Sequence, residues 1–175
     1  MNRTLVAGIG NIFLGDDGFG VETARRLAGC RLPEHVEVAD IGVRGVHLAY
    51  QLLDGYDTLV LVDATARGET PGTLYVIEYD GPGADPGAVP PIDGHRMTPD
   101  TVLALLDTLC AGTGGRAPRR TVIVGCEPAS VEEGIGLSPP VSDAVPEAVR
   151  LIEELLRDGE PSTAPTGAAE APRAR

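Results

Sequence analysis

The sequence predicts an α/β fold in which a largely parallel sheet is covered by helices on both faces. Two observations support this prediction. Apolar segments of strand length alternate along the chain with amphipathic segments of helix length. In addition, most of the strand-like segments are apolar throughout, which is typical of parallel strands that are buried on both faces.

Five segments have the composition of strands and are followed by residues that typically end a strand. The connection that leaves Asp63 is too short for a helical crossover, so the fourth strand can run antiparallel to its neighbour. The predicted strands are residues 4–9, 36–41, 58–63, 73–78 and 120–125.

Four segments have the periodicity of helices. Thr98, followed by Pro99 at the first helical position, is a good N-cap for the third. Residues 126–142 are polar and broken by proline, so we expect a long loop there, with Ser142 or Asp143 capping the last helix. The predicted helices are residues 20–28, residues 46–53, a helix beginning near Thr98, and residues 143–157.

The length of 175 residues fits one globular domain, which we place at residues 1–157. Residues 158–175 have almost no large apolar side chain, and we expect them to be a disordered tail. No apolar stretch approaches the ~20 residues that span a bilayer, and the first residues do not have the layout of a signal peptide. These features predict a cytoplasmic protein with no membrane partner.

Charge and cysteine usage exclude several classes of function. Acidic residues outnumber basic ones by 26 to 14, and the basic residues are scattered, which argues against a nucleic-acid partner. Every basic residue is arginine, so Schiff-base chemistry and a Walker-type phosphate lysine are excluded. Cys30, Cys110 and Cys126 have no metal-site spacing, and we expect buried small side chains, with Cys126 the one candidate nucleophile.

The stretch GNIFLGDDGFG, residues 10–20, follows the first predicted strand and is unusual for a phosphate-binding loop. Asp16 and Asp17 would repel a phosphate, and Phe13 occupies the third glycine position of the dinucleotide fingerprint. Asp40 stands where a ribose-binding acid would lie, so a dinucleotide-binding enzyme remains an alternative. Asp16 or Asp17 could also cap the helix that follows.

Three polar side chains are expected at the carboxyl ends of the strands, where ligand sites of such sheets lie. Asp17 follows the first strand, Asp63 ends the third, and His95 follows the Gly/Pro-rich residues 80–94. Two carboxylates and one imidazole form a ligand set for a divalent ion with open coordination positions. We therefore predict that these three residues converge on a cation.

Four separated stretches together resemble one family, the maturation endopeptidases of nickel-iron hydrogenases. The resemblance covers roughly residues 3–157. GIGNIFLGDDGFGV is similar to the opening motif of the family and LVLVDA to its second acidic motif. DGHRMTPDTVLALL is similar to its histidine motif, and VGCEPASVEEGIGLSPPVSDAVPEAV to its C-terminal signature.

The resemblance implies a three-layer α/β/α fold of the phosphorylase/hydrolase-like type, with a five-stranded, mostly parallel mixed sheet. It implies a peptidase that removes a C-terminal extension from the hydrogenase large-subunit precursor after nickel insertion. We expect the protein to be a monomer. Asp17, Asp63 and His95 match the metal-sensing and catalytic residues. The nickel would be supplied by the precursor, and no organic cofactor is expected.

Two mechanisms fit the resemblance. In one, a carboxylate activates water as a general base, as in an aspartic-type enzyme, and the metal serves recognition. In the other, the metal polarises the scissile carbonyl as a Lewis acid. A non-catalytic, nickel-dependent maturation chaperone would bind the precursor without cutting it, and it remains a further alternative.

Overall fold

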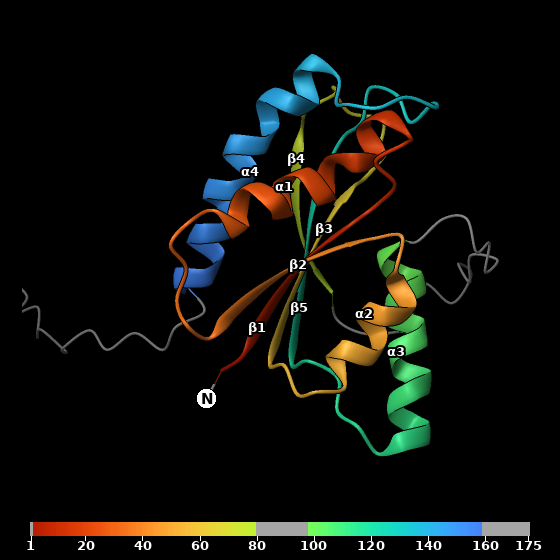
Figure 1. Ribbon diagram of the computed structural model, residues 1–175, viewed down its shortest axis with the longest axis vertical. Coiled ribbons are helices and arrows are strands. Elements are labelled where there is room, and N and C mark those ends of the chain that lie inside the picture. Colours follow the sequence, from red (N-terminus) through yellow and green to blue (C-terminus); the bar gives the residue numbers. More distant parts are fainter. Residues whose placement is uncertain (1, 80–97, 159–175) are drawn as a thin grey trace, which may run out of the picture.

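The computed structural model describes residues 2–79 and 98–158, and Figure 1 shows their arrangement. His95, the Gly/Pro-rich segment before it and the predicted tail from residue 159 onward lie outside the described residues. Five strands form one sheet in the order β2-β1-β3-β5-β4. The strands are β1 (Thr4–Ile9), β2 (Val36–Gly42), β3 (Thr58–Ala64), β4 (Leu74–Tyr79) and β5 (Arg120–Cys126).

The sheet is mixed, as predicted. β1 pairs in parallel with β2 and β3, and β3 pairs in parallel with β5. β4 is antiparallel to β5, because the short connection after β3 leaves no room for a crossover helix. The predicted α/β fold with a five-stranded, mostly parallel sheet is confirmed.

Helices cover both faces of this sheet (Figure 1). One layer packs on the sheet side chains that include Val60 and Val62, and the other on those that include Leu59 and Leu61. The alternation explains why β3 is apolar throughout, since both of its faces are buried. The first layer contains α1 (Phe19–Ala28) and α4 (Pro139–Asp158), and the second contains α2 (Gly45–Leu52) and α3 (Pro99–Thr113).

The helix ends agree with the sequence at α3 and differ at α4. Thr98 caps α3 by accepting a hydrogen bond from the Thr101 N–H, as predicted. The last helix begins at Pro139, four residues before the predicted start at Asp143. Proline breaks the interior of a helix, but it is compatible with a first helical turn, where its N–H is not needed.

Glycine allows α1 to lie directly on the sheet. A Cβ atom at Gly20 would overlap the carbonyl oxygens of Val62 and Ile9, and one at Gly8 would overlap the Gly20 carbonyl. The first turn of α1 therefore contacts the backbone of β1 and β3 without intervening side chains. This close packing holds the loop before α1 against the carboxyl ends of these strands.

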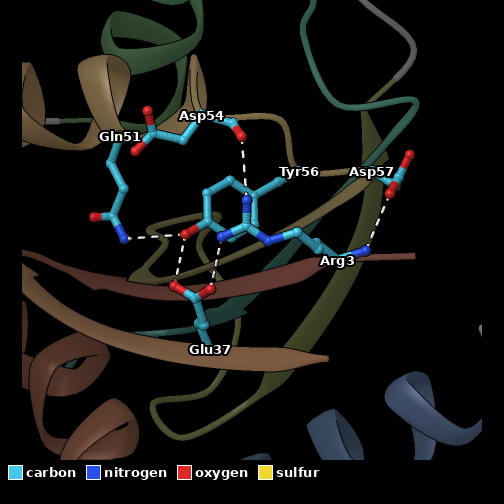
Figure 2. A network of polar contacts seen from close by, with 6 residues as sticks. All are labelled: Arg3, Glu37, Gln51, Asp54, Tyr56 and Asp57. Carbon is cyan, nitrogen blue, oxygen red and sulfur yellow. Dashed lines mark hydrogen bonds and ion pairs between the residues drawn. The ribbon is translucent and has the colours of Figure 1, made fainter. Parts of the chain in front are cut away.

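The amino ends of the strands are tied by a polar network, which Figure 2 shows. The Arg3 guanidinium donates to Glu37 at 2.8 Å and lies over the Tyr56 ring, 4.4 Å from its centroid. The Tyr56 hydroxyl donates to the other Glu37 oxygen at 2.6 Å. The Tyr56 and Arg3 hydrogen bonds lower the pKa of Glu37. Ligand sites of such sheets lie at the opposite end, outside the carboxyl ends of the strands. We therefore assign this network a structural role, which is to fix the amino ends of the strands.

Candidate active site

A loop between β1 and α1 brings Asp17 to the carboxyl end of the sheet. Asp17 lies in η1 (Gly15–Gly18), a single turn of 3-10 helix, and its Oδ2 accepts a hydrogen bond of 2.8 Å from the Asn11 N–H. Gly10 begins the loop with a φ of 125°, which L side chains rarely adopt. A Cβ there would overlap the Asp17 carbonyl and lie 3.5 Å from Asp63 Oδ1. Gly10 therefore lets the two aspartate-bearing segments approach.

Asp63, near the end of β3, is buried with 5% of its surface exposed. Its Oδ1 is buried, and no described residue forms a hydrogen bond with it. Burial and, second, the negative charge of Asp17 raise the pKa of Asp63 well above its usual value, against a smaller opposing effect of the Ala64 N–H. An unpaired buried carboxylate oxygen is costly, so this atom is suited to receive a proton or a cation.

The three predicted site residues are thus only partly placed. The structure brings Asp17 and Asp63 together, whereas His95 lies outside the described residues. Within residues 2–79 and 98–158, no cluster of three or more His, Cys, Asp or Glu side chains could hold a metal ion. The convergence of all three residues, and their catalytic and metal-binding roles, stay predictions.

Asp16 does not cap a helix, which corrects one of the roles expected for this pair. Neither aspartate makes a capping bond, and the residue at the N-cap of α1 is Gly18. Asp16 is instead buried against the segment that follows β5. It accepts hydrogen bonds from the backbone of Ala129 at 2.8 Å, from that of Ser130 at 3.2 Å, and from both the N–H and the hydroxyl of Ser138.

Ionised Asp16 is well satisfied in this position. Burial opposes its ionisation, but the Ser138 hydrogen bonds, followed by those from Ala129 and Ser130, lower its pKa overall. Backbone hydrogen bonds extend the attachment, with Gly15 N–H donating to the Gly134 carbonyl at 2.9 Å. The segment predicted as a long loop is therefore fixed to the loop that carries Asp17.

Glu127 is a site neighbour that the sequence reasoning missed. Its carboxylate is buried and accepts hydrogen bonds from the Arg67 N–H at 2.7 Å, the Gly68 N–H at 3.1 Å and the Tyr75 hydroxyl at 2.9 Å. The Arg67 bond contributes most to lowering the pKa of Glu127. Glu127 thus fixes the connection that follows Asp63. The sequence feature that could have identified Glu127 is an acidic residue placed directly after an apolar strand.

Two other expectations can be judged from the structure. Cys126 is fully buried, as predicted, and burial, aided by the charges of Asp16 and Glu127, raises its pKa to about 12. A thiolate nucleophile is therefore disfavoured. Asp40, the acid that a dinucleotide-binding enzyme would need, forms an ion pair of 3.0 Å with Arg25. Among the described residues, no helix is both long and apolar enough to cross a membrane.

Comparison with known proteins agrees with this architecture. The chain is 35% identical over 168 residues to the hydrogenase expression/formation protein HupD of Bradyrhizobium diazoefficiens, covering 90% of this chain and 79% of HupD. It is 31% identical over 159 residues to the hydrogenase 2 maturation protease of Escherichia coli, covering 89% of this chain and 92% of that protein.

Solved structures show the same fold. The hydrogenase maturating endopeptidase HybD from E. coli matches with a TM-score of 0.72 at 30% identity, covering 89% of this chain and 93% of HybD. The maturation protease HycI from Thermococcus kodakarensis matches with a TM-score of 0.65 at 26% identity, covering 89% of this chain and 93% of HycI. The family model described as hydrogenase maturation protease matches residues 21–155. The chain therefore belongs to the hydrogenase maturation protease family.

Proposed function

We propose that the protein is an endopeptidase that removes a C-terminal extension from the large-subunit precursor of a nickel-iron hydrogenase once nickel has been inserted. Family membership supports the reaction class. The observation that carries the proposal for this chain is the buried Asp63 Oδ1, which has no hydrogen-bond partner among the described residues and lies beside the charge of Asp17. Such a pair is incomplete without a positive group.

The nickel of the precursor supplies that positive group and is part of the substrate. Two carboxylates held close together repel one another, and a divalent ion near both replaces repulsion by attraction. Carboxylate oxygens together with one imidazole suit such an ion, and we assign the imidazole to His95. The precursor would then be held with its scissile peptide within reach of the aspartates, which is how positioning lowers a reaction barrier.

The chemical step can follow either of two routes. One aspartate can accept a proton from the attacking water, which would make the enzyme aspartic in type, or the ion can polarise the peptide carbonyl. Cys126 does not take part in either route, because its thiol is buried and its pKa is raised. We propose that the enzyme acts in the cytoplasm. It would act as a monomer, since a formal net charge of −12 favours a soluble, self-repelling surface.

The test uses two forms of the precursor, one loaded with nickel and one without it. The purified protein should release one short C-terminal peptide from the loaded form alone, as read by mass spectrometry. Asp17→Asn, Asp63→Asn and His95→Ala should each lose cleavage. Glu37→Gln, which changes an acid of the network at the strand starts (Figure 2), should cut normally.

Two outcomes would overturn the proposal. Efficient cutting of the nickel-free precursor would remove nickel sensing from the mechanism. Binding of the loaded precursor without any cutting would instead support the non-catalytic chaperone. Since Glu37→Gln, Asp17→Asn and Asp63→Asn each remove one carboxylate from an acidic protein, loss of activity in all three would point to a general charge effect.

A further inference from the structure

Three large apolar side chains are exposed on the two loops that meet beside Asp17. Phe13 is 60% exposed on the loop before η1, and Ile135 is 82% and Val131 42% exposed on the segment after β5. We call these residues the loop patch. Scattered exposed apolar residues are normal on a protein surface. These three, however, lie on the two short segments that follow β1 and β5, whose carboxyl ends share one edge of the sheet because both strands run parallel to β3.

The backbone holds Phe13 and Ile135 near one another. The Gly134 N–H donates to the Phe13 carbonyl at 2.9 Å, and Leu14 and Gly134 form an isolated parallel bridge. The Phe13 N–H in turn donates to the Asn11 side chain at 2.9 Å. Both loops are also joined through the buried Asp16 carboxylate described above. Because the frame is fixed, burying these side chains against a partner costs little ordering entropy in the backbone.

The surface beside the loop patch is acidic. Glu132 and Glu133 separate Val131 from Ile135 and are exposed. Among the residues that the structure describes, no ion pair involves either of these two acids. A complementary partner would therefore present apolar side chains together with lysine or arginine.

We propose that the loop patch is the docking surface for a segment of the hydrogenase large-subunit precursor that carries apolar side chains flanked by basic ones. This inference rests on the proposed function and specifies how the substrate is held. The patch is continuous with the candidate active site, since the loop of Phe13 continues directly into Asp17. A precursor whose nickel reaches Asp17 would lie beside this loop.

The experiment measures cleavage kinetics with nickel-loaded precursor for the double variant Phe13→Ser/Ile135→Ser. We expect KM to rise at least ~10-fold with kcat nearly unchanged, because the lost contacts serve binding and not the chemical step. Tyr50→Ser is the matched control, because Tyr50 on α2 is 58% exposed and lies on neither loop. It should leave KM unchanged. Thermal melts should show all variants folded, since the changed side chains are exposed.

A second variant tests the charge complementarity. Glu132→Gln/Glu133→Gln should raise KM at low salt and reduce the dependence of KM on salt concentration, as expected when a screened attraction is removed. An unchanged KM in the Phe13/Ile135 double variant would overturn the docking surface. So would a fall in kcat at constant KM, since that result would assign the loops to the chemical step.

A binding measurement separates this inference from the proposed function. If the wild-type protein does not cut, surface plasmon resonance on immobilised precursor still decides the docking role, because the double variant should bind at least ~10-fold more weakly than Tyr50→Ser. Light scattering after gel filtration tests the competing occupant. If the wild type is a dimer that Phe13→Ser/Ile135→Ser dissociates, the loop patch joins two copies of this chain and the proposal fails.

Discussion

Asp63 should make the stability of the protein fall as pH rises, and Asp63→Asn should remove this effect. The pKa of an Asp is ordinarily 3.8, and the buried Asp63 beside Asp17 has a pKa well above that value. Between the two values the folded state binds a proton that the unfolded state has released. Stability is therefore fully present below about pH 4 and is lost as pH rises through the folded-state pKa.

The size of the effect follows from the number of protons. One group that is fully protonated when folded and fully ionised when unfolded changes the free energy of unfolding by ~1.4 kcal/mol per pH unit. The difference in stability between wild type and Asp63→Asn should change with up to this slope, in favour of the variant as pH rises. A buried amide adds an offset that depends on its own hydrogen bonds, but this offset does not vary with pH.

The assay is urea unfolding of both proteins at several pH values from 4 to 8. Taking the difference between wild type and variant cancels the other acidic residues. Asp143→Asn is the control, because Asp143 is exposed on α4 and its replacement removes the same charge. It should give a difference that is nearly flat with pH. In an Asp17→Asn background the difference should stop changing at a lower pH, because the charge of Asp17 is the second cause of the raised Asp63 pKa. A pH-independent difference for Asp63→Asn would refute the reasoning.

Three further changes have definite expected outcomes. Gly20→Ala should destabilise by ~3 kcal/mol or more, measured by urea unfolding, because the added methyl meets backbone oxygens that cannot move aside. Asp16→Asn should cost ~1–3 kcal/mol at pH 7, because an amide cannot accept all four hydrogen bonds. This difference should shrink in melts below about pH 4, since the pKa of Asp16 is lowered and the stabilisation by its ionised form is lost as pH falls through that pKa. Cys126→Ser should still cut the loaded precursor in the mass-spectrometric assay; an inactive but folded variant would assign the chemistry to the thiol.

The fold was predictable because each strand carries its own signal. The apolar run of β3 and the short connection after Asp63 were enough to indicate a buried parallel strand followed by an antiparallel one, and both are confirmed. The start of α4 was not predictable from the proline pair alone. Pro139 is equally compatible with a loop and with a first helical turn, and the choice depends on packing of the following apolar face.

The candidate site was predictable in its position but not in its supporting contacts. The carboxyl ends of parallel strands gather ligand-binding residues in any such sheet, so Asp17 and Asp63 could be assigned to one edge. The role of Asp16 depends on Ser138, which is distant in sequence, and Glu127 depends on the backbone of the β3–β4 connection. Hydrogen bonds between distant loops leave no periodicity that a single sequence could reveal.

The adjacent aspartates show why two identical residues take different roles. They lie in one turn of 3-10 helix, where consecutive side chains point roughly 120° apart because the helix has about three residues per turn. One of them can therefore face the segment after β5 while its neighbour faces β3, and both cannot face the same partner. The backbone donors around Asp16 stabilise its charge, whereas no described residue donates a hydrogen bond to Asp63 Oδ1 near Asp17. The first aspartate thus stabilises the frame, and the second is the one that we propose for the cation.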